Sequence, residues 1–411
     1  MLLSKRLTTN RFTTKVGFPI RNLSDCPYGL IKKSNGRDQF LSLAIYFASV
    51  LAILFSSRIV LGDDVASKET LGFESTAIPV GIEISKQCPE TILPHPMCIS
   101  GQSELSQIYE ISTRHLCDRF RSINFDQPNV DVNKWSGNGW LRSDVEEALP
   151  SGGTGLLTII YVHGNFMDRN NALERVRIVD RYLQAQTDRP YRILMLSWPS
   201  QREAKPLRDV LMNAESAECQ SLYVAWMLQR LRDEPQVSLL GFSFGARAVT
   251  GGLHLDAGGA IPGYACSPKP NLGPSLNYRI GLVAPAIDRN WIEKNGRHQL
   301  AMTHIESMVN LYNSQDPILR RFRFMDRSSR PIAAGFAGFA GFAGFAGLTD
   351  PRATTPLTGQ PRIRQYDCGS VIGTTHAEKS YYGECPYFQT ILQHVLWKDP
   401  WESTCNAYVV P

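Results

Sequence analysis

The sequence lacks the short motifs that mark common nucleotide and metal sites. It contains no G-x-x-x-x-G-K-S/T phosphate loop, no G-x-G-x-x-G dinucleotide fingerprint and no H-E-x-x-H zinc motif. None of its nine cysteines forms a C-x-x-C pair, so zinc-ribbon and thioredoxin-type sites also lack their motif. The residues therefore offer no recognisable site for a metal or a nucleotide cofactor.

Most of the chain also lacks an excess of charge of either sign. The 411 residues carry a formal net charge of +5, but residues 1–39 alone hold eight basic and two acidic residues, so the remainder sums to −1. A nucleic-acid-binding domain normally shows a basic face, and we therefore expect no nucleic acid among the partners. With 43% hydrophobic and 20% charged residues, the composition is that of a globular protein. The length allows one large domain or two smaller ones.

A basic stretch and then an apolar run open the chain. Residues 40–55 are sixteen residues without a charge. Positive residues before an apolar segment favour export of the chain beyond that segment, so we interpret residues 1–62 as a targeting leader. The run is shorter than the roughly 17–25 residues of a full span, which leaves open a signal peptide cleaved after residue 62 or a single membrane anchor within residues 40–62. A buried core helix and a misplaced start codon are the alternatives.

The cysteine count agrees with export. Eight cysteines follow the apolar run: Cys88, Cys98, Cys117, Cys219, Cys266, Cys368, Cys385 and Cys405. An even number in an exported domain permits four disulfides, although the sequence does not give their pairing. Buried free thiols are the alternative, because a core of this size does not need covalent stapling.

Short apolar runs alternate with amphipathic stretches through most of the exported part. Residues 63–104 contain four prolines and form an expected linker or extended arm, residues 105–400 form the main domain, and residues 401–411 form a tail. The pattern predicts strands over residues 107–116, 156–162, 191–198, 236–242, 278–284, 307–312 and 366–372. It predicts helices over residues 143–149, 171–186, 206–232, 244–255 and 387–397. This alternation indicates an α/β fold with a mostly parallel sheet covered on both faces.

A low-complexity insertion lies between the last two expected strands. Residues 335–346 repeat the triplet Gly-Phe-Ala four times, which is far too short and too poor in proline for a collagen helix. An expanded surface loop is one interpretation. A mobile apolar flap beside an active site, lining an entrance for an acyl chain, is the other.

The clearest chemical signal is the G-x-S-x-G motif of residues 241–245. A strand is expected before it and a helix after it, which is the context in which the serine occupies a strained turn and its hydroxyl rises above the sheet. The flanking glycines let the strand and the helix approach closely. Because that context disfavours an ordinary glycine-rich turn, we predict Ser243 as a nucleophile.

A serine nucleophile needs a histidine base and an orienting carboxylate, which in this architecture follow in the order Ser, acid, His. His376 stands in a loop after the last expected strand and is the predicted base, whereas His394 lies in an apolar helical pattern and is expected in the core or at its rim. Asp316, in the turn after strand 307–312, is the preferred acid. Asp288, one strand earlier, is the alternative acid, and Asp367 is a weaker third choice.

The tetrahedral oxyanion of acyl transfer needs preformed N–H donors. A loop after the strand 156–162 usually donates one of them, and the residue after the nucleophile donates the other. We therefore expect Asn165 or Phe166, together with Phe244, to form the oxyanion hole. His163 precedes the serine in the chain and is expected to brace this loop rather than to act as the base.

These motifs, in this order, resemble the α/β-hydrolase superfamily, and most nearly a poorly characterised bacterial branch of esterase- or lipase-like enzymes. The resemblance covers about residues 105–400 and rests on residues 163–165, 197–199, 241–245, 313–317 and the His376 loop. It implies an eight-stranded, mostly parallel sheet, a covalent acyl-serine intermediate hydrolysed by water, and no cofactor. The interval of 60 positions from Asp316 to His376 and the unusual leader depart from the family pattern.

The sequence thus predicts a serine hydrolase acting on a small-molecule or lipid ester, exported and either membrane-anchored or periplasmic or secreted. Peptidase or thioesterase activity on the same triad is an alternative, because the triad does not encode the acyl group. A non-catalytic binding module of the same fold is a further alternative. The complete Ser, Asp and His set argues against that module, which has no need of all three.

Overall fold

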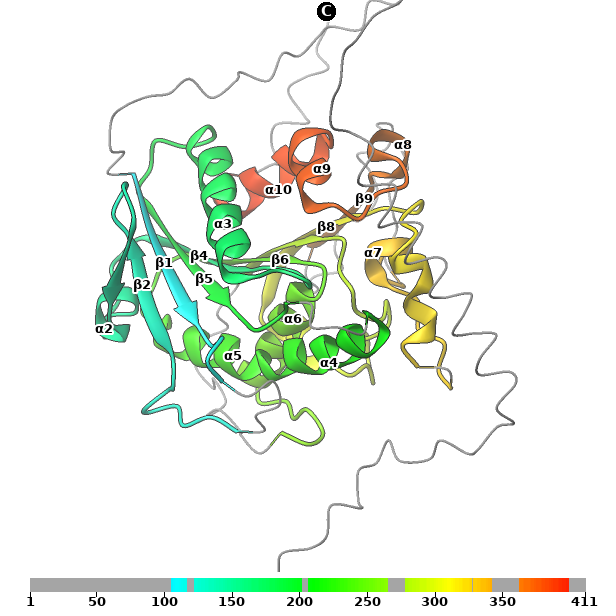
Figure 1. Ribbon diagram of the computed structural model, residues 1–411, viewed down its shortest axis with the longest axis horizontal. Coiled ribbons are helices and arrows are strands. Elements are labelled where there is room, and N and C mark those ends of the chain that lie inside the picture. Colours follow the sequence, from blue (N-terminus) through cyan, green and yellow to red (C-terminus); the bar gives the residue numbers. More distant parts are fainter. Residues whose placement is uncertain are drawn as a thin grey trace, which may run out of the picture. The chain divides into compact units, whose positions relative to one another are not determined.

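The computed structural model describes residues 105–116, 122–201, 206–264, 278–326, 328–341 and 362–398. The predicted leader (1–62), the arm (63–104) and the tail (401–411) lie outside these residues. Within them, no helix has both the length and the apolar character needed to cross a membrane. The described residues form one compact unit, in which a central sheet lies between layers of helices (Figure 1).

The sheet has nine strands in the order β3-β2-β1-β5-β4-β6-β7-β8-β9. Their bounds are β1 Ser106–Ser112, β2 Asp131–Trp135, β3 Trp140–Ser143, β4 Leu157–Val162, β5 Tyr191–Ser197, β6 Val237–Phe242, β7 Tyr278–Val283, β8 Ile305–Tyr312 and β9 Arg362–Asp367. The seven strands from β1 to β9 in this order run parallel, whereas β2 is antiparallel to β1 and β3 antiparallel to β2. The α/β class and the mostly parallel sheet are confirmed.

The expected count of eight strands is wrong, because β2 and β3 form an antiparallel hairpin at one edge. No strand is expected from the sequence between residues 117 and 155. Only one residue of β2 is fully buried and none of β3, so neither strand carries the apolar run that marks a buried strand. All residues of the inner strands β4, β5, β6 and β7 are buried, which is why their sequences are predominantly apolar.

Helices cover both faces of the sheet. Their bounds are α2 Val145–Ala148, α3 Arg169–Gln184, α4 Pro206–Cys219, α5 Ser221–Arg230, α6 Gly245–Asp256, α7 Ala334–Ala337, α8 Gly369–Ile372, α9 Glu378–Gly383 and α10 Tyr387–Val395. Figure 1 shows α3, α9 and α10 on one side of the sheet and α4, α5 and α6 on the other. Short 3₁₀ helices, η1 Gln299–Thr303 and η2 Leu319–Phe324, precede and follow β8.

Two expected elements differ in the structure. The helical region 206–232 is divided at Gln220 into α4 and α5. The strand expected over residues 366–372 ends at Asp367 and continues as helix α8, because the Asp367 carboxylate accepts the backbone N–H of Gly369 at 2.9 Å and turns the chain. The last strand, β9, also starts four residues earlier than expected, at Arg362 instead of residue 366.

The described part of the Gly-Phe-Ala repeat, residues 335–341, is built into the domain. The Gly335 N–H donates to the Pro285 carbonyl at 2.8 Å, and a Cβ at Gly335 would stand 2.3 Å from the Ala284 carbonyl carbon. Phe339 is fully buried and Phe336 packs against the core. For these residues the expectation of a surface loop or mobile flap is wrong, and residues 342–346 lie outside the described residues.

Candidate active site

Ser243 occupies a strained turn between β6 and α6. Its φ of 52° lies in the left-handed region, which non-glycine residues rarely adopt. Three backbone hydrogen bonds hold it there, because its N–H donates to the Val283 carbonyl at 3.0 Å and its own carbonyl accepts from Ala286 at 3.0 Å and Ala246 at 3.1 Å. The surrounding sheet thus fixes a conformation that the serine would not keep alone.

The glycines of the G-x-S-x-G motif allow the close packing of this turn. A Cβ on Gly245 would lie 2.1 Å from the Val162 carbonyl oxygen at the end of β4, and one on Gly241 would lie 3.0 Å from the backbone of Ala246. No side chain is compatible with the first distance. Gly245 therefore sets how near α6 approaches the neighbouring strand, and with it the position of Ser243.

The structure brings the three predicted triad residues together. His376 Nε2 lies 3.0 Å from Ser243 Oγ, and His376 Nδ1 lies 2.6 Å from Asp316 Oδ2. The second Asp316 oxygen accepts the backbone N–H groups of Ile318 at 2.8 Å and Leu319 at 3.0 Å. With Asp316 bound to Nδ1, the proton resides there and Nε2 is left as the acceptor for the serine hydroxyl.

The electrostatics favour His376 as a base stabilised by its acid. Burial lowers the pKa of His376, but the charge and hydrogen bond of Asp316 raise it, with a further contribution from the charge of Glu378, and the net result is a pKa above the ordinary 6.5. Asp316 is completely buried, so its carboxylate acts on the imidazole with little screening by water.

The other candidate acids have different partners. Asp288 lies in the segment after β7, where its carboxylate accepts the Asn290 N–H at 2.8 Å and its backbone bridges to Ala333. Asp367 caps the start of α8 and accepts the Ser314 N–H at 3.1 Å. Both carboxylates thus hold local turns, and among the three candidates the structure places Asp316 against His376.

His163 braces the loop after β4, as the sequence indicated. Its ring stacks on Trp198 with centroids 5.4 Å apart, and its Nε2 accepts from the Trp198 backbone N–H at 3.2 Å. Its Nδ1 therefore carries the proton and donates to the Gly164 carbonyl at 2.9 Å. Burial and the neighbouring Arg114 charge lower the pKa of His163 to about 3, so the ring stays neutral.

The predicted oxyanion-hole residues lie on two segments beside Ser243. Phe166 has a φ of 55° and a partly exposed ring, and the Asn165 side chain accepts from Asn213 of α4 at 2.7 Å. Phe244 is the N-cap of α6, and the first N–H groups of a helix have no partner within it. The helix dipole adds a partial positive charge at this end, which suits a developing oxyanion.

Three further residues position the site, and the sequence assigned them no role. Arg114 donates to His163 Nε2 at 3.1 Å and to the Met167 carbonyl at 3.1 Å, tying β1 to the oxyanion loop. Asn313, buried after β8, donates to the carbonyls of Gly373 and Thr375 in the His376 loop. No local sequence pattern marks Arg114 as a residue of the site. The position of Asn313, three residues before the predicted acid, is a signal that could have indicated its role.

Glu378 is the third of these positioning residues, two positions after His376. Its buried carboxylate accepts from Tyr161 of β4 at 2.7 Å and from Tyr382, and it pairs with Arg175 of α3 at 3.2 Å. Burial raises the pKa of Glu378, while Arg175 and the two tyrosine hydroxyls lower it in part. This network fixes the start of α9 against the sheet.

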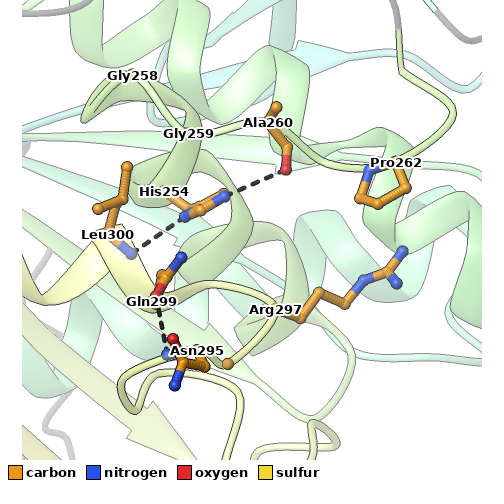
Figure 2. Close-up of a pocket in the computed structure, with 10 residues that line it drawn as sticks. His254, Gly258, Gly259, Ala260, Pro262, Asn295, Arg297, Gln299 and Leu300 are labelled. Carbon is orange, nitrogen blue, oxygen red and sulfur yellow. Dashed lines mark hydrogen bonds between the residues drawn. The ribbon is translucent and has the colours of Figure 1, made fainter.

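His394 and a separate cavity lie apart from this chemistry. His394 is buried in α10 and hydrogen-bonds to the Ser307 carbonyl at 3.2 Å, which confirms the expected core position. A cavity of about 630 Å³ lies at the far end of α6 from Ser243, and Figure 2 shows both ring nitrogens of His254 there occupied by backbone groups of Ala260 and Leu300.

Within the part of the chain that the structure describes, no group of three His, Cys, Asp or Glu residues is arranged to hold a metal ion. A comparison with models of known protein families finds no match to this chain, and a search of curated proteins finds no similar sequence. The interpretation of the site therefore rests on its own geometry.

Proposed function

We propose that this protein is a serine hydrolase of the α/β-hydrolase fold that cleaves carboxylic esters through an acyl-serine intermediate. The observation that carries this proposal is the chain of contacts from Ser243 through His376 to the buried Asp316, at 3.0 and 2.6 Å, on a strained turn between a strand and a helix.

The topology supports the fold assignment. The nucleophile follows β6, the acid follows β8 and the histidine follows β9, and these parallel strands all end at the same edge of the sheet. The antiparallel β2–β3 hairpin, at the opposite edge of the sheet from β9, is an addition to this pattern, and the long interval between Asp316 and His376 departs from it.

The chemistry follows from the three contacts. His376 Nε2 takes the proton of the Ser243 hydroxyl as the oxygen attacks the ester carbon, and Asp316 stabilises the imidazolium that forms. Backbone N–H groups at Phe244 and at Asn165 or Phe166 receive the oxyanion. His376 then donates the proton to the departing alcohol, and the same steps with water release the acid and regenerate Ser243.

Exposed apolar side chains on the supporting segments favour an ester with an apolar acyl group. Phe166 lies in the oxyanion loop, and Ile318 follows Asp316 by two residues. Large exposed apolar side chains near a catalytic group are a usual contact for acyl chains.

A fluorophosphonate probe tests the nucleophile. The probe should label the wild-type protein and spare Ser243→Ala, and ester turnover should fall by on the order of 10⁶ in that variant. Ser238→Ala, on β6 and remote from His376, is the matched control and should still be labelled. Equal labelling of wild type and Ser243→Ala would overturn the proposal.

A panel of p-nitrophenyl esters tests the acyl group. We expect measurable turnover that rises with acyl-chain length if the apolar side chains line the acyl site, and that falls with length for a small-acyl esterase. Turnover of thioester or peptide substrates above that of every ester would assign the triad to those alternatives, and the absence of both labelling and turnover would favour the binding module.

A further inference from the structure

Two buried cysteines lie at the two ends of the segment that carries His376. Cys368 follows β9 and is the N-cap of α8, and Cys385 comes two residues before α10 begins. Both side chains are buried free thiols in the structure, and their Sγ atoms are 2.7 Å apart, longer than the roughly 2.05 Å of a disulfide bond but closer than non-bonded sulfur atoms normally approach. Of the three cysteines in the described residues, Cys219 lies elsewhere, with its Sγ 3.5 Å from the Tyr264 hydroxyl.

The segment between them holds the base of the triad. His376 is eight residues after Cys368 and nine before Cys385. Asn313 holds the carbonyls of Gly373 and Thr375 at 2.8 and 2.9 Å, which anchors the middle of the segment without joining its ends. A bond between the two sulfurs would join β9 to the start of α10 and close the loop around His376.

We propose that Cys368 and Cys385 form a disulfide that closes the His376 loop and holds the imidazole in contact with Ser243 and Asp316. The role given to His376 rests on the proposed hydrolase function, whereas the existence of the bond does not. The export predicted from the leader provides the oxidising compartment in which such bonds persist.

The two sulfurs differ in how readily each gives up its proton. The hydrogen bond from Cys368 and the backbone N–H groups of Tyr387 and Phe388 lower the pKa of Cys385 despite its burial. The interaction with Cys385, together with burial, raises the pKa of Cys368. The largest cause of both shifts is the same, the 2.7 Å contact between the two sulfurs in the folded protein.

The bond forms by exchange with a disulfide donor, a protein or small-molecule disulfide, before folding buries the pair. The thiolate of one cysteine attacks one donor sulfur and releases the first donor thiol, and the thiolate of the other cysteine then attacks the protein sulfur of the mixed disulfide and releases the second. Two protein thiols are oxidised, one donor disulfide is reduced to two thiols, and the two thiol protons pass to those products.

Peptide mapping of the full-length protein without reduction tests the bond. The protein is folded in the presence of oxidised glutathione, unfolded, alkylated and digested. We expect one linked peptide pair that contains Cys368 and Cys385 and is lighter than the two free peptides by two hydrogens. Recovery of both cysteines as alkylated thiols, or linked to other cysteines, would overturn the proposal.

Thermal unfolding of matched variants tests its effect. Cys368→Ala should lower the Tm by on the order of 10 °C, because it opens a loop of this length, and the double variant with Cys385→Ala should lose little more. Reduction and refolding should lower the wild-type Tm to the same value and leave the double variant unchanged. Cys219→Ala, which also removes a buried sulfur, should remain sensitive to reduction. Additive losses or a reductant-insensitive wild type would contradict a bond.

The readouts separate this inference from the function. The linked peptide is detected by mass whether or not the fluorophosphonate probe labels Ser243. A linked peptide in a protein that the fluorophosphonate probe does not label would support the disulfide and contradict the hydrolase proposal. Labelled Ser243 in a protein with two free thiols would support the hydrolase proposal and contradict the disulfide.

Discussion

His163 and His376 show how neighbouring groups decide the chemistry of one residue type. His163 lies beside the Arg114 guanidinium, and burial together with that positive charge lowers its pKa to about 3. His376 lies against the Asp316 carboxylate, which raises its pKa despite burial. One ring is therefore a neutral brace, and the other holds a proton more readily than an ordinary histidine, as the proposed base requires.

Replacement of Asp316 tests the assignment of the acid. Asp316→Asn keeps the shape of the side chain but removes the charge and the Nδ1–H acceptor that fix the tautomer of His376, so we expect kcat to fall by on the order of 10⁴. Asp288→Asn, the matched control, should keep most of the wild-type kcat because Asp288 holds a local turn. The reverse order of the two kcat values would transfer the role to Asp288.

The pH profile of kcat/KM tests the charge on His376. The neutral imidazole is the active base and its pKa is raised, so activity should be low in acid and rise with pH through a midpoint above 6.5. Initial rates over the acid and neutral range, corrected for hydrolysis of the ester in buffer alone, measure this midpoint. A midpoint at or below 6.5 would show that Asp316 does not act on His376 as proposed.

At the scale of elements, the site is assembled by strands that end together. The segments after β6, β8 and β9 each supply one member of the triad, although up to 133 sequence positions separate them. The apolar runs predict β6 and β8 because these strands are buried in the sheet, whereas the expected strand 366–372 overlaps only the last two residues of β9. The residues that follow the three strands fall at one edge of the sheet.

The close approach of α6 to β4 is a second feature at this scale. In Gly245→Ala the new Cβ would meet the Val162 carbonyl at 2.1 Å, and backbone cannot move aside as a flexible side chain can. We expect a loss of about 1–3 kcal/mol or more in the free energy of unfolding, with loss of turnover as Ser243 shifts. Urea denaturation measures the free energy of unfolding, and ester hydrolysis measures the turnover.

Gly139→Ala provides the control for that substitution. No atom lies within 4 Å of a Cβ at Gly139, in the turn between β2 and β3. Its unfolding free energy should stay within about 0.5 kcal/mol of wild type. Equal stability of the Gly139 and Gly245 variants would mean that the close contact at Gly245 has no energetic consequence.

At the scale of the whole molecule, the positive charge of the chain is concentrated before the folded domain. Residues 1–39 contribute the surplus, and the rest of the chain is close to neutral. This distribution is the basis for the predicted export, and the even number of cysteines after residue 62 is compatible with that prediction.

A reporter fusion tests this targeting. A phosphatase that is active only outside the cytoplasm, fused after residue 62, should be active because residues 1–39 keep their positive end inside. The same fusion without residues 40–55 should be inactive, since the apolar run is the segment that enters the membrane. Equal phosphatase activity of the two fusions would contradict the prediction that residues 40–55 direct export.

Local sequence was sufficient to predict six of the seven parallel strands, the serine turn and the choice of Ser243, Asp316 and His376 as candidates, but it located only the end of β9. Strand periodicity and turn chemistry are local, so they can be read from neighbouring residues. The tertiary structure alone decided the edge hairpin, the burial of the first part of the Gly-Phe-Ala repeat, and the support from Arg114, Asn313 and Glu378. It also brought Cys368 and Cys385 together, because such contacts depend on how distant segments pack and leave no local pattern.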